Sequence, residues 1–516
     1  MKRRDRCPSR TLMLVLLTAG TAIVLAGLSG CATLTGANAR AKKLGRVTIT
    51  PDGTGFIEKV PGLFGTESRP FVPFGTNYYD PDTNWPPKLW QQFDPNRVKE
   101  HFRVMSELGV NCARVFLTAG SFQPNVNTVD ERALEKLDTF LKIAREARIH
   151  LILTGPDHWE GTPSYWKPDR FAGAESLQAL EHFWSVVAKR YAGEPAIFAW
   201  DLLNEPSIPW FVESWRPQWN SFLQSKYGSW SALKTAYAHE LAEGESWGNV
   251  TVPKDQADAG NPRLLDWQLF RESLADEWVR RQADAIRQAD PAALVTVGYI
   301  QWSYPVVRIG NPSLYSAFNP HRQEKWLDFI SIHFYPAMGQ PFASRENWEM
   351  NLAYLQSVLA YCHTGKPVVL GEYGWYGGGA AQGRPRLDEH QQGRWIVAEI
   401  EASRRLACGW LSWPFADTPD STDMSRYGGM VKENMIRKMW AWRFKSYAAG
   451  LADLCQPAPE LPDIDVTASL TAPVRDLVPM QEKHAQRISE AIRAAGTMPE
   501  VKDRAREMIR SPRTPE

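Results

Sequence analysis

The amino-acid sequence predicts an α/β protein, a (β/α)8 TIM barrel with an insertion after strand four and a C-terminal extension. Apolar, β-rich runs alternate with helical patterns eight times along most of the 516-residue chain. The runs are apolar almost throughout, which is typical of parallel strands covered by helices. No repeat with the period of a solenoid is apparent. The hydrophobic content of 43% is enough for one large core.

Residues 1–30 are predicted to be a targeting segment rather than part of the fold. Four Lys or Arg residues lie among the first six, an apolar run extends from Thr11 to Leu28, and LSGC ends at Cys31. The pattern resembles a bacterial lipoprotein signal, which implies cleavage before Cys31 and lipid attachment to its sulfur. An uncleaved membrane anchor is the alternative, because the apolar run approaches spanning length. Either way, we expect an exported protein held at the membrane on the periplasmic or cell-surface side.

Residues 31–46 read as a short polar linker to the barrel domain, residues 47–450. A hairpin is expected around Asp52 and Gly53, because Asp-Gly between two strand-like runs is a strong turn signal. The barrel strands are expected at residues 71–79, 111–117, 149–154, 196–204, 293–300, 327–335, 367–375 and 409–415.

Helices are expected between these strands because apolar residues there recur with helical spacing. In the first of them, Asp94 and Pro95 fit an N-cap and first helical position, and Gly109 fits the C-terminal end. The expected helices cover about residues 95–109, 130–147, 175–192, 263–288, 346–362, 388–406 and 434–449.

Two segments interrupt or follow this alternation. Residues 207–260 form a Trp-rich excursion after the fourth strand, with two short helical patterns and a polar loop. Residues 451–516 form a charged C-terminal extension with one weak helical stretch at 481–495. The composition of this extension predicts partial disorder, and docking on the barrel remains the alternative.

Composition excludes several classes of partner and cofactor. A formal net charge of +1 provides no field that would favour nucleic acid. The mature cysteines, Cys112, Cys362, Cys408 and Cys455, lack the spacing of a zinc site. Buried free thiols are preferred over a disulfide, which an exported protein also permits. Neither a metal nor an organic cofactor is predicted. The 22 tryptophans fit either sugar-stacking surfaces or a large core.

Polar and aromatic residues collect where the predicted strands end, which is where barrel enzymes place their active sites. Two glutamates, Glu205 after the fourth strand and Glu372 at the end of the seventh, form the central pair. Glycoside cleavage in most families needs two such carboxyl groups flanking the bond. The other strand-end residues are Asn77, Tyr78, Arg114, Asp157, His158, Trp159, Asn204, Tyr299, Trp302, His333, Tyr335 and Trp413.

Four motifs stand at strand ends in order: NEP, HFY, GEYG and SW. The ordered set resembles glycoside hydrolase clan A over roughly residues 53–450, and most of all the family 5 cellulases and mannanases. Residues 219–241 and 264–291 are similar instead to the segment after the acid/base in family 42 β-galactosidases. The clan is therefore a safer assignment than either family.

The resemblance implies that Glu205 is the general acid/base and Glu372 the nucleophile. Asn204 would contact the sugar 2-hydroxyl, Tyr335 would hold the nucleophile, and His333 would lie beside the acid/base. We expect Glu205 to be kept protonated by partial burial and by the charge of Glu372.

Further substrate-binding residues are expected around this pair. Arg114 resembles the arginine that hydrogen-bonds near the nucleophile, and Trp413 the floor under the sugar being cleaved. His158 is a looser match, and Asn77 and Trp159 complete the set. Each also has a structural alternative: an ion pair for Arg114, a core position for His333, barrel packing for Trp413. The same choice between stacking platform and loop core applies to Trp159, Trp166, Trp210, Trp215 and Trp302.

The sequence therefore predicts a retaining glycoside hydrolase that cleaves β-glycosidic bonds in poly- or oligosaccharides. The alternatives are an exported, non-catalytic carbohydrate-binding barrel, a β-galactosidase-like exo-enzyme, and a transglycosylase of the same clan. An open groove would suit internal cleavage of a glucan or mannan, whereas a pit closed by residues 207–260 would suit terminal sugars. The glycan and the oligomeric state stay open.

Overall fold

The computed structural model describes residues 43–62, 65–83, 88–167, 169–254, 261–304, 315–336, 348–381, 384–464 and 474–496. The predicted signal peptide and the lipidation site Cys31 lie outside these residues. The chain divides into two units, Met1–Lys43 and Leu44–Glu516, and every element named below lies in the second. No helix in the described ranges has the length and apolar composition needed to cross a bilayer.

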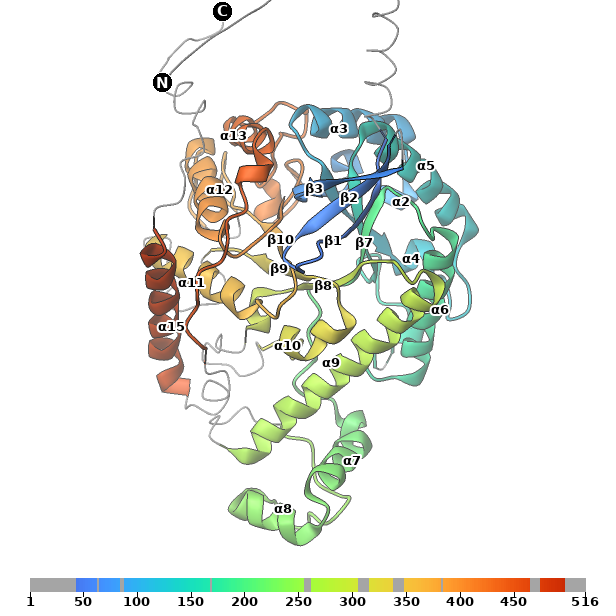
Figure 1. Cartoon of the computed structure of the whole chain (residues 1–516). Coiled ribbons are helices and arrows are strands. Elements are labelled where there is room, and N and C mark those ends of the chain that lie inside the picture. The colour runs from blue at the N-terminus through green and yellow to red at the C-terminus, as the bar shows by residue number, and fades with distance from the viewer. Residues whose placement is uncertain are drawn as a thin grey trace, which may run out of the picture. The chain divides into compact units, whose positions relative to one another are not determined.

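Eight parallel strands close into a barrel surrounded by helices, which confirms the predicted fold (Figure 1). The strands follow one another around the barrel in chain order, and β10 and β11 complete the ring against β4. Their bounds are β4 (Phe74–Tyr78), β5 (Cys112–Thr118), β6 (His150–Asp157), β7 (Ile197–Asn204), β8 (Val295–Tyr299), β9 (Ile330–Phe334), β10 (Val368–Tyr373) and β11 (Trp410–Ser412).

The helices of the ring and its additions begin and end close to the predicted positions. The α-helices are α2 (Lys88–Gln91), α3 (Pro95–Glu107), α4 (Ala119–Phe122), α5 (Glu131–Ala147), α6 (Ala174–Arg190), α7 (Arg216–Tyr227), α8 (Trp230–Tyr237), α9 (Pro262–Ala289), α10 (Pro320–Gln323), α11 (Trp348–Tyr361), α12 (Glu389–Ser403), α13 (Met439–Ala448) and α15 (Val474–Ala494). Short 3-10 turns are η1 (Pro81–Thr83), η2 (Ser164–Trp166), η3 (Glu213–Trp215), η4 (Ala238–Glu240), η5 (Gln301–Ser303), η7 (Glu324–Trp326), η8 (Met424–Arg426) and η9 (Leu451–Asp453).

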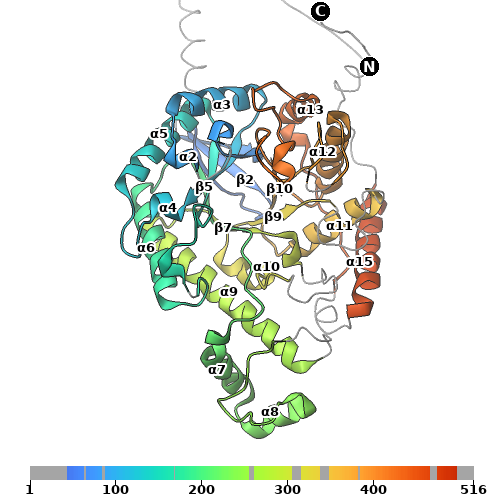
Figure 2. The same ribbon diagram turned by 180° about the vertical axis from the view of Figure 1, so that it is seen from behind.

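A small antiparallel sheet closes the N-terminal end of the barrel. It contains β1 (Arg46–Ile49), β2 (Phe56–Pro61) and β3 (Thr66–Phe71), with the predicted hairpin joining β1 to β2. Phe56 packs edge-on against Phe198 and Phe329, at ring-centroid distances of 4.9 and 5.4 Å. With this end plugged by aromatic side chains, the opposite end, viewed in Figure 2, is the one at which a site can open.

Three predicted boundaries were wrong. Residues 71–79 are not one strand: Phe71 ends β3 and Phe74 begins β4 after Val72 and Pro73. The closing helix begins at Met439 rather than at Asn434, because a turn precedes it and Lys438 is buried against Asp417, with Nζ 2.7 Å from Oδ1. The helix of the extension is also longer than predicted, since α15 begins at Val474.

The two added segments lie at different places on the barrel. α15 packs against α11, so the described part of the extension is docked on the barrel. α7 and α8 lie outside the ring of helices beside α9 in both views (Figures 1 and 2). The side chains of Lys226, Tyr227 and Tyr237 tie them to Asp266 of α9. The described part of the excursion therefore does not cover the strand ends.

A buried carboxyl group on α12 leads to a stability prediction. Glu399 is fully buried, and within the described ranges neither of its oxygens has a hydrogen-bond partner. Burial raises the pKa of Glu399 well above its ordinary value of 4.5, because desolvation disfavours the charged form. Glu399→Met should therefore raise the free energy of unfolding at pH 7 by about 1–3 kcal/mol.

The pH dependence of that gain has a definite sign. The native state keeps the Glu399 proton to higher pH than the unfolded chain, so the stability of the native protein falls as pH rises above 4.5. The advantage of Glu399→Met should thus grow with pH in urea denaturation curves. The exposed Glu135 on α5 provides the control, and Glu135→Met should change stability by less than about 0.5 kcal/mol. Destabilisation by Glu399→Met at every pH would contradict the prediction.

Candidate active site

The barrel brings Glu205 and Glu372 together at the C-terminal ends of their strands. Glu205 directly follows β7, and Glu372 lies in β10. A carboxyl oxygen of each and a ring nitrogen of His333 all lie within 4.8 Å of one another. A gap of this size matches retaining glycosidases, whose carboxyl groups stand about 5–5.5 Å apart, and is too short for inverting ones.

The backbone at Glu205 is bent in a way that few non-glycine residues adopt. Its φ is 47°, in the left-handed region. The Glu205 N–H still donates to the Gly298 carbonyl at 2.8 Å, so the pairing of β7 with β8 extends to this residue. Strained backbone of this kind is typical of functional positions, where the surrounding structure holds it in place.

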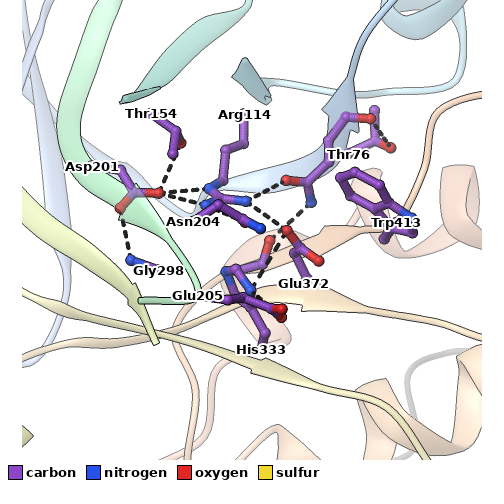
Figure 3. A network of polar contacts seen from close by, with 12 residues as sticks. Thr76, Arg114, Thr154, Asp201, Asn204, Glu205, Gly298, His333, Glu372 and Trp413 are labelled. Carbon is purple, nitrogen blue, oxygen red and sulfur yellow. Dashed lines mark hydrogen bonds and ion pairs between the residues drawn. The ribbon is translucent and has the colours of Figure 1, made fainter. Parts of the chain in front are cut away.

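Arg114 is the centre of the polar network under the two glutamates (Figure 3). Its guanidinium donates to Asp201 at 2.8 Å, to Asn77 and Asn204 at 3.0 Å each, and to Glu372 Oε1 at 2.6 Å. Arg114 and Asn77 are both fully buried. Arg114 thus hydrogen-bonds to Glu372, as the resemblance implied, and Asn77 hydrogen-bonds to Arg114. That these two residues also contact the substrate stays a prediction.

Asp201 is a member of this network that the motifs did not identify. It is fully buried in the middle of β7 and also accepts hydrogen bonds from the Thr154 hydroxyl at 2.8 Å and the Gly298 N–H at 2.7 Å. The available signal was an aspartate inside the apolar run AIFAWDLLN. A buried carboxylate needs a cationic partner, and Arg114 supplies it.

Both oxygens of Glu372 accept hydrogen bonds. Arg114 donates to Oε1, and the Tyr335 hydroxyl donates to Oε2 at 2.6 Å. Burial raises the pKa of Glu372, while His333, Arg114 and Tyr335 oppose that shift. Arg114 has no acceptor, and burial keeps the pKa of Tyr335 well above its usual range. These two donors therefore favour the charged form of Glu372 and oppose the effect of its burial.

Glu205 is held by different neighbours. Burial raises its pKa to about 7, Arg114 opposes this shift, and the negative charge of Asp157 adds to it. The expected partial burial is present, the two glutamates repel each other, and Asp157 is a further assisting carboxylate that the motifs did not indicate. Glu205 thus has a pKa near 7, whereas two hydrogen-bond donors stabilise the charged form of Glu372, and differences of this kind can separate an acid from a nucleophile.

These pKa shifts predict a bell-shaped pH profile. Activity that requires protonated Glu205 should fall as pH rises above about 7, the value to which burial raises its pKa. The acidic limb should follow protonation of Glu372, above the ordinary glutamate pKa of 4.5. Measuring kcat/KM for an aryl β-glycoside from pH 4 to pH 10 tests both limbs. A decline that begins near pH 5 on the alkaline side would contradict the assignment of Glu205.

His333 lies beside Glu205, as the resemblance implied. Its Nδ1 is 3.0 Å from Glu205 Oε1 and 3.5 Å from Glu372 Oε1. Complete burial lowers the pKa of His333 to about 4, so the imidazole is neutral near pH 7. With its hydrogen on Nδ1, His333 donates to Oε1 of Glu205 and leaves the other oxygen to carry the catalytic proton.

The predicted aromatic residues divide into exposed and buried groups. Trp413 is half-buried, its Nε1 donates to Ser425 at 2.9 Å, and its ring lies 5.9 Å from that of Phe116. Trp159 is half-buried, and its ring lies 4.7 Å from that of Phe116. Trp302 is also half-buried. The loop tryptophans that prove to be buried core residues are Trp166, Trp210 and Trp215.

His158 follows β6 and, among the described residues, makes no hydrogen bond or ion pair with either glutamate. Its side chain is 44% exposed, and its Nδ1 lies 3.0 Å from Nη1 of Arg170. The looser match to the family motif thus corresponds to a residue that contacts the polar side chains at the end of β6, not the central network.

Among the described residues, two groups of side chains have the spacing of a metal site, and neither suits a cation. In the first, Glu205, His333 and Glu372, the nucleophile already accepts from Arg114 and Tyr335. In the second, Asp80, Asp82 and His101, the guanidinium of Arg97 lies 2.9 and 3.7 Å from the two carboxylates. A positive charge is in each case supplied by an arginine.

Comparison with known proteins extends the likeness beyond the motifs. The family model described as β-galactosidase, of glycoside hydrolase family 42, matches residues 171–374. Mannan endo-1,4-β-mannosidase F of Aspergillus clavatus is 21% identical over 285 residues. That match covers 47% of this chain and 64% of the fungal protein, so the chain spans less than two thirds of this relative.

This chain shares its fold with solved structures of a β-galactosidase and of a GH5_18 enzyme. A β-galactosidase from Rahnella sp. R3 superposes with a TM-score of 0.64 at 16% identity, over 81% of this chain and 63% of that one. A GH5_18 enzyme from Bifidobacterium longum in complex with Manβ1-4GlcNAc gives a TM-score of 0.56 at 16% identity, over 83% and 89%. These structures show the shared fold, and together with the family-model match and the mannanase relative they support the predicted assignment to glycoside hydrolase clan A.

Proposed function

We propose that this protein is a retaining glycoside hydrolase that cleaves β-glycosidic bonds through a covalent glycosyl-enzyme intermediate. The observation that carries the proposal is the pair Glu205 and Glu372, with carboxyl oxygens within 4.8 Å of each other at the open end of the barrel. Their surroundings support the proposed roles, because burial favours the acid form of Glu205 while two donors stabilise the charged form of Glu372.

In the first step, Glu372 attacks the anomeric carbon as Glu205 protonates the glycosidic oxygen. The bond to the leaving sugar breaks, and a bond between the anomeric carbon and a carboxyl oxygen of Glu372 forms. Asn204 Oδ1 accepts from Arg114 at 3.0 Å, so its amide nitrogen is the atom oriented to donate to the sugar 2-hydroxyl. Trp413 presents its half-buried ring as the surface against which the sugar stacks.

In the second step, water replaces the leaving sugar. Glu205, now a carboxylate, removes a proton from this water, whose oxygen attacks the anomeric carbon and releases Glu372. Each step inverts the configuration, so the β-anomer is released first. Following the anomeric protons by NMR during the first minutes of hydrolysis tests this prediction. Initial release of the α-anomer would refute the double-displacement mechanism.

For the substrate we propose a β-linked hexose glycoside, with β-mannosides and β-galactosides as the first candidates. The relatives and neighbours carry the names mannan endo-1,4-β-mannosidase and β-galactosidase, and one neighbour holds Manβ1-4GlcNAc. Parallel assays of aryl β-mannoside, β-galactoside and β-glucoside with a mannan and a cellulose will identify the sugar. Turnover of the aryl glycosides without any attack on polymers would assign terminal cleavage, and turnover of none would refute the proposed function.

We also propose that the enzyme is tethered to the cell envelope through a lipid on Cys31. Support comes from the basic start, the apolar run and LSGC at the predicted cleavage point. One lipidated residue anchors a protein to a bilayer surface without spanning it. Cys31→Ser should move activity from the membrane fraction to the soluble fraction, and unchanged membrane association would exclude the lipid.

A further inference from the structure

Next to Glu205, the end of β6 carries a polar cluster that the two-glutamate mechanism does not use. Asp157 is the last residue of β6, and its side chain is fully buried. β6 pairs with β7 in parallel, with Thr154 opposite Asp201, so Asp157 and Glu205 lie at adjacent strand ends. Adjacent strands are about 4.8 Å apart. The charge of Asp157 accordingly reaches Glu205, whose pKa it raises.

The hydrogen bonds of this cluster are incomplete. Oδ1 of Asp157 accepts from the His158 N–H at 2.6 Å, whereas its buried Oδ2 meets no partner among the described residues. Arg170 is held over the ring of Trp166 at 4.4 Å and reaches His158 with Nη1. Its buried Nη2 likewise meets no hydrogen-bond partner in the described part of the chain. One acceptor and one strong donor are therefore left over beside the acid/base.

His158 cannot resolve this mismatch. Its Nδ1 lies 3.1 Å from Asp157 Oδ1 and 3.0 Å from Arg170 Nη1. If Nδ1 accepts a hydrogen bond from Arg170, its lone pair also faces the negative carboxylate of Asp157, which is unfavourable. If Nδ1 instead carries a hydrogen and donates it to Asp157, that hydrogen faces the N–H groups of the Arg170 guanidinium, which is also unfavourable. Leaving buried polar groups unsatisfied is costly, and a hydroxyl group, which donates and accepts at once, satisfies both.

Aromatic contacts show which part of a substrate would reach the cluster. Trp159, the next residue after His158, packs on Phe116, and Phe116 packs on Trp413. The cluster thus lies on the side of the site where Trp413 supports the sugar being cleaved. His158 is 44% exposed and contacts both Asp157 and Arg170.

We propose that Asp157 and Arg170 form a hydroxyl-binding pair that selects the sugar in the cleaved position. Asp157 accepts a hydrogen bond from one ring hydroxyl, and Arg170 donates to the oxygen of the same hydroxyl or its neighbour. The pair would read the axial or equatorial orientation of that hydroxyl in a neutral hexose. This inference rests on the proposed glycosidase function and adds to it the residues that discriminate between epimeric sugars.

The test is a double-mutant cycle in which changes to the protein are combined with removal of single hydroxyl groups from the substrate. kcat/KM is measured for the preferred aryl β-glycoside and its 2-, 3-, 4- and 6-deoxy analogues, with wild type, Asp157→Ala and Arg170→Met. Asp157→Ala should lower kcat/KM for the parent glycoside about 100-fold, and loss of the recognised hydroxyl should cost wild type a similar factor. In Asp157→Ala, removing the same hydroxyl from the substrate should lower kcat/KM by less than about threefold, because the carboxylate that binds this hydroxyl is already absent.

The controls separate recognition from folding. Asp157→Asn keeps the shape of the side chain and serves if Asp157→Ala lowers the Tm. Asp138→Asn removes an exposed carboxylate that pairs with Arg190 on the outside of the barrel and should leave every ratio unchanged. Equal deoxygenation losses in wild type and both Asp157 variants at every ring position would overturn the inference while leaving the glycosidase intact. A wild-type protein that hydrolyses none of the glycosides would overturn the proposed function as well.

Discussion

Replacing Glu372 by alanine is expected to lower kcat/KM for an aryl β-glycoside by about 10⁴-fold or more. Without this carboxylate no covalent intermediate forms, and no other described carboxylate lies in its position between Arg114 and Tyr335. The network of Arg114 with Asp201 should persist, so the variant should fold. Initial rates with an activated aryl glycoside, together with a thermal unfolding curve, check both statements.

An added small nucleophile distinguishes a lost nucleophile from a disturbed site. Azide fits the space that Glu372→Ala creates and attacks the anomeric carbon from the same face, while Glu205 still protonates the leaving group. The expected product is the α-glycosyl azide, formed in a single inverting step. Restored turnover with hydrolysis to the β-anomer, or substantial activity without azide, would show that another residue is the nucleophile.

Replacing Glu205 by alanine should have an effect that depends on the leaving group. A sugar or alkyl leaving group needs the proton, so kcat/KM should fall by about 10³-fold. A dinitrophenyl group leaves unaided, so kcat/KM for that substrate should fall by only about tenfold, while kcat falls further because water is no longer deprotonated. The alkaline limb set by the Glu205 pKa of about 7 should also disappear.

Azide provides a complementary readout for this variant. It attacks the accumulated glycosyl-enzyme without needing a base, and the product should be the β-glycosyl azide, the opposite anomer to that from Glu372→Ala. Glu135→Ala, at an exposed position on α5, is the control and should match wild type. Equal losses for sugar and dinitrophenyl leaving groups would contradict the role of Glu205 as the general acid.

Much of the fold follows from local patterns in the sequence. The apolar strands, the long helix α9 and the hairpin between β1 and β2 lie where residue spacing predicts them, because periodicity and turn chemistry act over a few residues. The errors arise where distant contacts override local preference. α13 begins late because Lys438 is drawn into a buried ion pair with Asp417, which belongs to a loop.

In the site, too, some residues are predictable from local sequence patterns and others only from distant contacts. Glu205, Glu372, Tyr335 and Asn204 are identifiable because their motifs stand at strand ends in a fixed order. Asp201 was hidden inside an apolar run, although its charge was a usable signal. The role proposed for Asp157 could not be predicted from the sequence. It depends on the burial of its side chain and on its position beside Glu205, and both result from the pairing of β6 with β7.

By itself, the sequence determined that this is a barrel of eight strands whose polar residues gather at one end, and that two of its glutamates have glycosidase motifs around them. The tertiary structure alone decided their chemistry. Arg114 and Glu372 are 258 positions apart and meet at 2.6 Å only because β10 and β11 close the ring against β4. Distances, desolvation and the left-handed turn at Glu205 arise from that closure, and these quantities separate an acid from a nucleophile.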